Sequence, residues 1–200
     1  RFFLWNGARF CIQRFYTMEE KKTYFTAKNL ALTGIFAALA FGVSLLEFPL
    51  FPAAPFFKLD FSFAVILFSA YMLGALGGEI VALISIGLHL LVSSSAGVGE
   101  LANFIMAQVF AILPAIAYHY KRNFKTVIIS LCVAITVNCG IALLCNRYLL
   151  FPLFFGDGAA AQFKEFWGFA LALNLIKGLS NAIITILLYK RLKNLLNKIF

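Results

Sequence analysis

Charged residues are scarce in this sequence. Asp, Glu, Lys and Arg make up 12% of its 200 residues, about half the share usual in soluble domains, whereas 62% of the residues are hydrophobic. The mean hydropathy is +0.92. This composition excludes a water-soluble globule and indicates a membrane protein.

Motifs for ATP binding, metal binding and common catalytic sets are also absent from the sequence. It contains no G-x-x-x-x-G-K-[ST] phosphate loop, no H-E-x-x-H zinc motif and no C-x-x-C pair. Three of the four cysteines lie in one apolar stretch, which favours a packing role over a metal site or a disulfide framework. We therefore expect no cofactor on this chain, and we expect any ATPase that drives its work to be a separate chain.

Six apolar stretches are long enough to cross a bilayer, for which a helix needs roughly 20 residues. They are residues 27–46, 59–76, 78–94, 99–119, 126–151 and 164–189. The sequence thus predicts an all-α membrane protein in which residues 18–200 form one domain of six transmembrane helices. Residues 1–17 mix Arg with aromatics, so we expect an N-terminal extension that is either interfacial or non-native and precedes a start at Met18.

The basic residues predict the orientation in the membrane. The formal net charge is +9, and Lys and Arg accumulate on the cytoplasmic side of membrane proteins. With the N-terminus inside, thirteen of the seventeen basic residues lie in the cytoplasm. We therefore predict an N-in, C-in, multi-pass protein of the cell membrane. Topology then explains the positive charge, and no nucleic-acid partner is expected.

The first predicted outer loop, residues 47–58, reads EFPLFPAAPFFK and combines three prolines with four phenylalanines. Proline cannot continue a helix, so this loop is stiff as well as apolar. Two interpretations remain open. The loop is either a lid over a binding site or an interfacial segment whose aromatic side chains contact lipid.

The sixth apolar stretch carries polar residues at helical spacing. Asn174, Lys177 and Asn181 occupy positions i, i+3 and i+7, which share one helical face. An ammonium group at membrane depth is costly unless it has a partner or a function. Lys177 is therefore either one half of an ion pair between helices or a donor to a ligand.

Other polar residues gather near the predicted outer ends of the helices. Glu100 and Asn103 open the fourth stretch at i, i+3, although helix capping alone could account for Glu100. Lys58 and Asp60 open the second stretch, where they could simply pair with each other. We predict a site for a small polar molecule with an apolar body, formed by Lys58, Asp60, Glu100, Asn103, Asn146, Asn174 and Lys177.

The first stretch carries a ridge of small residues, Gly34, Ala38 and Gly42, at i, i+4 and i+8. Such a ridge lets another helix approach closely. It serves either packing within the chain or docking of another membrane subunit.

Four local motifs, in order, resemble one family of transporter subunits. They are KLDFS at 58–62, GELANF at 99–104, Asn146 followed by Pro152, and NLIKG at 174–178. Together they resemble the substrate-binding S-component of energy-coupling factor (ECF) vitamin transporters, most closely the riboflavin-specific branch, with the pantothenate branch as the alternative. The resemblance covers about residues 27–195.

The resemblance implies a six-helix ABC-transporter subunit that binds a vitamin with high affinity from outside. It also implies docking on one transmembrane T-component and two ATPases, with Gly34, Ala38 and Gly42 contacting the T-component. Two other classes remain open, an autonomous proton-coupled carrier using Glu47, Glu100 and Lys177, and a membrane enzyme. The sequence shows no nucleophile or metal set to support the enzyme.

Overall fold

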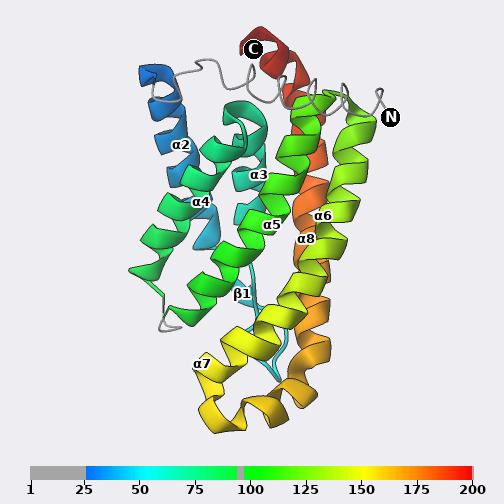
Figure 1. The fold of residues 1–200 in the computed structure, drawn as a ribbon. Coiled ribbons are helices and arrows are strands. Elements are labelled where there is room, and N and C mark those ends of the chain that lie inside the picture. Colours follow the sequence, from blue (N-terminus) through cyan, green and yellow to red (C-terminus); the bar gives the residue numbers. More distant parts are fainter. Residues whose placement is uncertain (1–25, 94–96, 200) are drawn as a thin grey trace, which may run out of the picture.

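The computed structural model describes residues 26–93 and 97–199 as a bundle of helices (Figure 1). The predicted extension 1–17 and Met18 lie outside the described residues. A helix falls in each of the six predicted stretches: α2 (Ala27–Ser44), α3 (Ser62–Leu73), α4 (Ala75–Leu90), α5 (Val98–Tyr120), α6 (Phe124–Cys145) and α8 (Ala159–Ile199).

The beginning of α2 and the end of α8 lie at the same end of the bundle, at the top of Figure 1, which we call the terminal end. Residues 27–44, 98–120 and 124–189 are helical, apolar and long enough to cross a membrane, while α3 and α4 are shorter apolar helices of 12 and 16 residues. The fold is therefore that of an all-α membrane protein.

Glycines set a close contact between α3 and α4. The boundary between α3 and α4 lies at Gly74, whose φ of 86° suits glycine. The predicted stretches place this boundary at residue 77. Gly77 and Gly78 lie inside α4 instead. A Cβ on Gly78 would lie 2.5 Å from the Ala70 Cβ, so the missing side chain is what allows the two helices to approach.

The opposite end of the bundle, which we call the hairpin end, carries an irregular helical segment. The predicted stretches 126–151 and 164–189 leave residues 152–163 as an outer loop, and this prediction is wrong, because the region is helical. A π-helical turn, η1 (Asn146–Leu150), leads into α7 (Phe151–Phe155), η2 (Gly156–Gly158) and then α8. Pro152 is the second residue of α7 and directly follows the π-helical turn, so the chain stays helical through a residue type that usually ends a helix.

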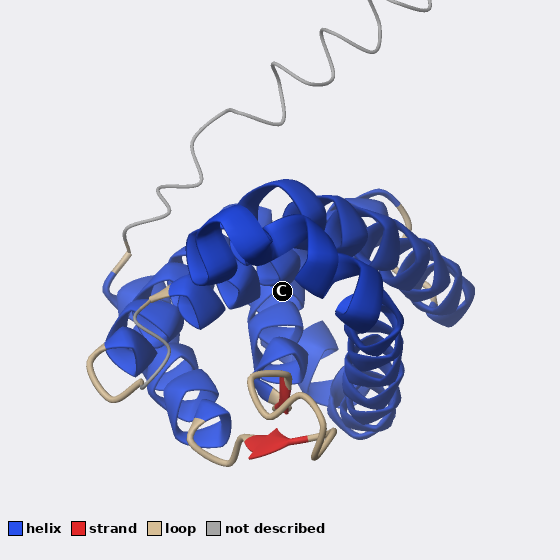
Figure 2. Cartoon of the chain, turned by 90° about the horizontal axis from the view of Figure 1, so that it is seen from below, coloured by secondary structure: helices blue, strands red, loops and turns tan. Residues whose placement is uncertain are grey.

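The proline-rich loop forms a short β-hairpin at the same end. Strands β1 (Phe48–Pro49) and β2 (Lys58–Leu59) pair antiparallel, with Phe48 opposite Leu59. Seen along the helices, the two strands lie at one side of the bundle (Figure 2). Ala54 at the turn is fully buried and Phe57 nearly so, so the hairpin packs onto the helices.

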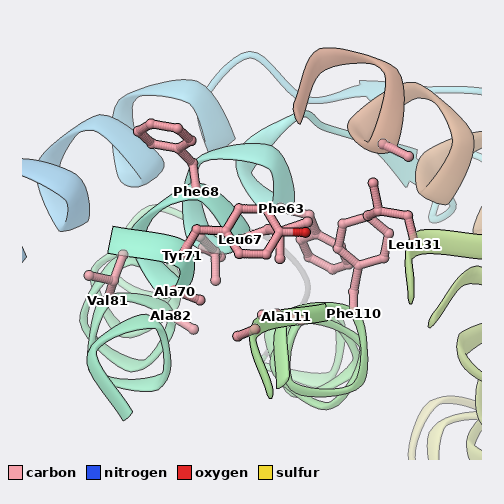
Figure 3. Close-up of a cluster of buried hydrophobic side chains, with 14 of the residues drawn as sticks. Phe63, Leu67, Phe68, Ala70, Tyr71, Val81, Ala82, Phe110, Ala111 and Leu131 are labelled. Atoms are coloured by element: carbon pink, nitrogen blue, oxygen red, sulfur yellow. The ribbon is translucent and has the colours of Figure 1, made fainter. Parts of the chain in front are cut away.

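Two hydrophobic clusters hold the bundle together. The larger cluster joins α2, α3, α4, α5, α6 and α8. It includes Phe63, Leu67, Phe110 and Leu131 (Figure 3). The smaller cluster fixes the hairpin to α7 and α8 through Phe57, Phe151, Leu173 and their neighbours. The hairpin end thus has its own apolar support, separate from the main core.

Candidate binding site

A cavity of about 360 Å³ lies at the hairpin end. Its wall comes from segments far apart in the sequence: the hairpin, the beginnings of α3 and α5, the η1–α7 segment and the middle of α8. A volume of this size suits a small-molecule ligand. Its lining residues include Glu47, Pro55, Phe56, Phe57, Lys58, Phe63, Glu100, Asn103, Met106, Asn146, Leu150, Phe151, Phe154, Phe155, Leu173, Asn174 and Lys177.

Six of the seven predicted site residues line this one cavity: Lys58, Glu100, Asn103, Asn146, Asn174 and Lys177. The seventh, Asp60, is buried behind the wall and contacts Lys177. The structure thus brings the predicted residues together, while their roles toward a ligand remain predictions.

Lys177 is 4% exposed and is held by three groups. Its ammonium group donates hydrogen bonds to Asp60 Oδ2 at 2.5 Å and to Asn103 Oδ1 at 2.8 Å, and it lies 4.2 Å from the centre of the Phe63 ring. The ion pair that the sequence left open is present, and the same ammonium group also lines the cavity.

Asp60 does not pair with Lys58, so that expectation is wrong. Besides binding Lys177, the Asp60 carboxylate accepts hydrogen bonds from the backbone N–H and the hydroxyl of Ser62 at the beginning of α3. This arrangement places the carboxylate at a helix N-terminus, where free N–H groups stabilise negative charge.

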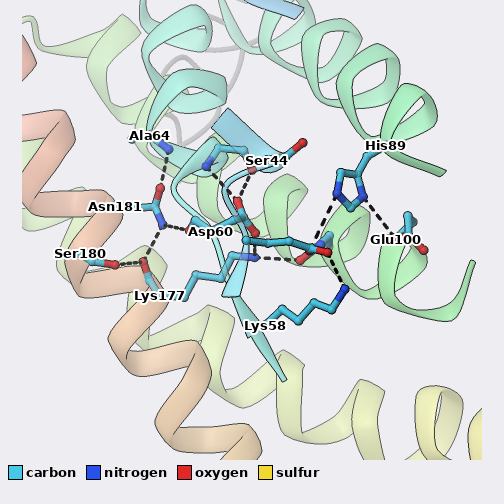
Figure 4. Close-up of polar contacts among 12 residues, drawn as sticks. Ser44, Lys58, Asp60, Ala64, His89, Glu100, Lys177, Ser180 and Asn181 are labelled. Carbon is cyan, nitrogen blue, oxygen red and sulfur yellow. Dashed lines mark hydrogen bonds and ion pairs between the residues drawn. The ribbon is translucent and has the colours of Figure 1, made fainter. Parts of the chain in front are cut away.

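Asn181 holds the backbone around Asp60. Its Oδ1 accepts a hydrogen bond from the Ala64 N–H at 2.8 Å, and its Nδ2 donates to the Asp60 C=O at 3.1 Å (Figure 4). Asn181 is fully buried and does not line the cavity. It shares the polar face that the sequence indicated, but its contacts are structural.

A second group of polar side chains, linked by successive contacts, lies on the other side of the cavity. Lys58 Nζ lies 2.5 Å from Glu47 Oε1, and Glu47 Oε2 lies 3.8 Å from His89 Nε2. The other ring nitrogen of His89, Nδ1, lies 3.2 Å from Glu100 Oε1. Glu100 lies in the first turn of α5, after the N-cap Gly97, where a carboxylate complements the helix dipole as the sequence indicated, and it also lies beside the His89 ring (Figure 4).

Asn146 and Asn174 both line the cavity, and each side-chain amide donates one hydrogen bond to a backbone carbonyl group. Asn146 Nδ2 donates to the Ala142 C=O at 2.7 Å, and Asn174 Nδ2 donates to the Ala170 C=O at 2.8 Å. An amide carries a second N–H and an oxygen acceptor, so each side chain retains the capacity to bind a ligand.

Phenylalanines form the apolar part of the cavity. The Phe56 ring lies 4.6 to 6.5 Å from the rings of five others: Phe57, Phe151, Phe154, Phe155 and Phe166. Sequence reasoning assigned aromatic cover to the hairpin but missed α7, because it expected a loop there. The run FPLFF at 151–155 was the available signal.

The small-residue ridge on α2 faces away from the rest of the chain. Gly34, Ala38 and Gly42 are exposed, whereas Thr33, Ala37 and Ala40 are buried. A Cβ on Gly34 or on Gly42 would have no neighbour within 4 Å. The ridge therefore does not pack closely within the part of the chain that the structure describes, and docking of another subunit on it stays a prediction.

Comparisons with known proteins agree with this arrangement. Residues 28–191 match the family described as "ECF transporter, substrate-specific component". The chain is 32% identical over 177 residues to "Riboflavin transporter RibU" of Staphylococcus aureus (strain TCH60), covering 86% of this chain and 94% of that protein. It is 27% identical to "Riboflavin transporter FmnP" of Bacillus subtilis (strain 168), covering 83% and 92%.

A solved structure also matches. It is described as "Structure and mechanism of the S component of a bacterial ECF transporter", with a TM-score of 0.74, 32% sequence identity, and coverage of 84% of this chain and 97% of that one. The family match covers most of the chain and places it among transporter subunits, not enzymes, that associate with an ECF module. The chain belongs to the family of substrate-specific components of ECF transporters.

Proposed function

We propose that this chain binds riboflavin in the cavity at the hairpin end and is the substrate-binding subunit of an ECF-type importer in the cell membrane. The observation that carries the proposal is the convergence of six separately placed polar residues on one aromatic-lined cavity. Riboflavin has a flat ring system with polar edges and a hydroxylated chain. Phenylalanines would cover the faces of the ring, while amide and ammonium groups would bind its polar edge.

The relatives support riboflavin over pantothenate, because the proteins described above are named riboflavin transporters. The alternative, pantothenate, would bind Lys177 through a charge-assisted bond from its carboxylate. Asp60 already neutralises that ammonium group, which weakens this attraction.

The proposal includes partner subunits. A transmembrane T-component would dock on Gly34, Ala38 and Gly42, where the exposed small residues allow close helix contact. Two ATPases bound to that component would supply the energy, so this chain would need no cofactor of its own.

Calorimetry on the purified protein tests the binding step. We expect riboflavin to bind tightly without ATP and to tint the preparation yellow, whereas pantothenate, folate and thiamine should not bind at comparable concentrations. Tight binding of pantothenate alone would replace riboflavin with the alternative. Failure of all four vitamins to bind would refute the assignment.

Proteoliposomes test the transport step. Uptake should require the complete ECF module and ATP. Riboflavin uptake by this chain alone would instead support the autonomous carrier.

A further inference from the structure

The two ammonium groups on the cavity wall are both already paired. Lys177 lies against Asp60, and Lys58 lies against Glu47, each at 2.5 Å. An anionic ligand at either one would lie close to a carboxylate that already neutralises the ammonium group. The wall therefore offers little attraction to a second negative charge.

Glu100 adds a third carboxylate, which is buried and lies beside an imidazole. His89 Nδ1 lies 3.2 Å from Glu100, while its Nε2 lies 3.8 Å from Glu47, so one ring serves two carboxylates. An imidazole carries at most one positive charge. Among these six groups, three carboxylates thus face two ammonium groups and one imidazole, and the cluster is neutral at most and negative when His89 is neutral.

Such a wall treats neutral and anionic ligands differently. A hydroxyl group can donate to Glu47 or Glu100, since ionised carboxylates only accept hydrogen bonds. A phosphate or carboxylate would lose its hydration, would find each cation occupied, and would lie close to like charges in a region of low dielectric.

We propose that the cluster of Glu47, Lys58, His89 and Glu100 is a specificity element that makes the cavity select uncharged ligands over anionic ones. It rests on the proposed function for the choice of ligand. Glu47 and Glu100 determine the selection directly, and His89 positions both of them.

A matched pair of flavins tests this proposal. Riboflavin and riboflavin 5′-phosphate share the ring system and differ in the charge at the end of the chain. Titration of the purified protein with each should give at least a tenfold weaker affinity for the phosphate. The measured quantity is the Kd for riboflavin 5′-phosphate divided by the Kd for riboflavin.

Three substitutions should move this ratio in opposite directions. Glu47→Gln releases Lys58, and Glu100→Gln removes a negative charge, so each should lower the ratio roughly tenfold by strengthening phosphate binding. Lys58→Gln leaves Glu47 without its cation and should raise the ratio. Glu165→Gln, which removes an exposed carboxylate of α8 outside the cavity lining, is the control and should leave the ratio unchanged.

Equal binding of both flavins by the wild type would overturn the proposal. So would a ratio that stays constant in the Glu47 and Glu100 variants, or a Lys58→Gln variant with a lower ratio. The Lys58 side chain is 32% exposed, so this variant should fold even where a buried substitution fails.

Failure of the proposed function gives a different result. If neither flavin binds the wild type, riboflavin is the wrong substrate. The same variants are then titrated with pantothenate and with panthenol, its neutral alcohol, and the neutral partner should again bind more tightly.

Discussion

The terminal end and the hairpin end of the bundle are built from the same helices but differ in how they use polar groups. At the terminal end, Tyr71, Tyr118 and Tyr189 pack ring against ring within the main apolar core. At the hairpin end, ion pairs and amides surround a cavity. One end gains stability from dense packing, while the other keeps open space and supports it with paired charges.

The difference shows how a small membrane protein can carry buried charges at low cost. Each ammonium group of the cavity has a carboxylate partner from a connecting segment, and each pair ties that segment to β2 or to α8. Removing one partner of a buried pair leaves the other uncompensated, which costs far more than removing both. Substitutions at the two ends should therefore separate stability from ligand binding.

Lys177→Met should have the largest effect, because it combines both losses. We expect the free energy of unfolding to fall by about 3–5 kcal/mol through the unpaired Asp60, and riboflavin affinity to fall roughly 10- to 100-fold. Thermal unfolding in detergent and flavin titration measure the two effects.

The double variant Lys177→Met, Asp60→Asn is the control for this substitution. It should recover most of the stability but not the affinity. If it binds riboflavin as tightly as the wild type, Lys177 has only a structural role and the contrast between the two ends fails at this residue.

Leu131→Ala tests the packed region. Leu131 is 2% exposed and does not line the cavity, so its truncation should lower the free energy of unfolding by about 2–5 kcal/mol. Riboflavin affinity of the folded fraction should change less than twofold. A loss of affinity as large as that of the Lys177 variant would mean that the core and the cavity are not separable.

Phe56→Ala tests the aromatic cover at the hairpin end. Phe56 is 37% exposed and contacts several rings on α7 and α8, so its loss should weaken riboflavin binding by about 1 kcal/mol or somewhat more. The unfolding temperature should change little. The opposite pattern, lower stability with unchanged affinity, would make this ring part of the packing instead of the site.

Ala38→Leu should have the smallest effect on the isolated protein. Ala38 is exposed on α2, so neither stability nor riboflavin affinity should change measurably. Co-purification with the T-component and riboflavin uptake should nevertheless be lost, because the leucine blocks close helix contact. Wild-type uptake by this variant would remove the ridge as a docking surface.

Much of this molecule could be predicted from sequence because a bilayer restricts what a chain can do. Apolar stretches became helices, and polar residues at helical spacing on α8 pointed to the cavity. The irregular end of α6 was missed because Pro152 and two glycines resemble a loop, whereas the chain stays helical through Pro152.

The partners of the polar residues could not be predicted from spacing. Lys177 and Asp60 are 117 positions apart, and proximity in sequence suggested Lys58 for Asp60 instead. Glu47 lies before the hairpin, and only the antiparallel pairing of β1 with β2 brings it to Lys58. Long-range pairing depends on how helices are arranged in space, which periodicity does not specify.

The hydrogen bonds that Asn181 makes to Asp60 and Ala64 have a consequence for the entropy of binding. They join α8 to the beginning of α3, protein to protein, so the backbone beneath Lys177 keeps its geometry without help from a ligand. A ligand that binds there loses its own translational and rotational entropy, but binding does not have to order this segment of the protein. Because this part of the site is preorganised, a few individually weak hydrogen bonds can add up to tight binding.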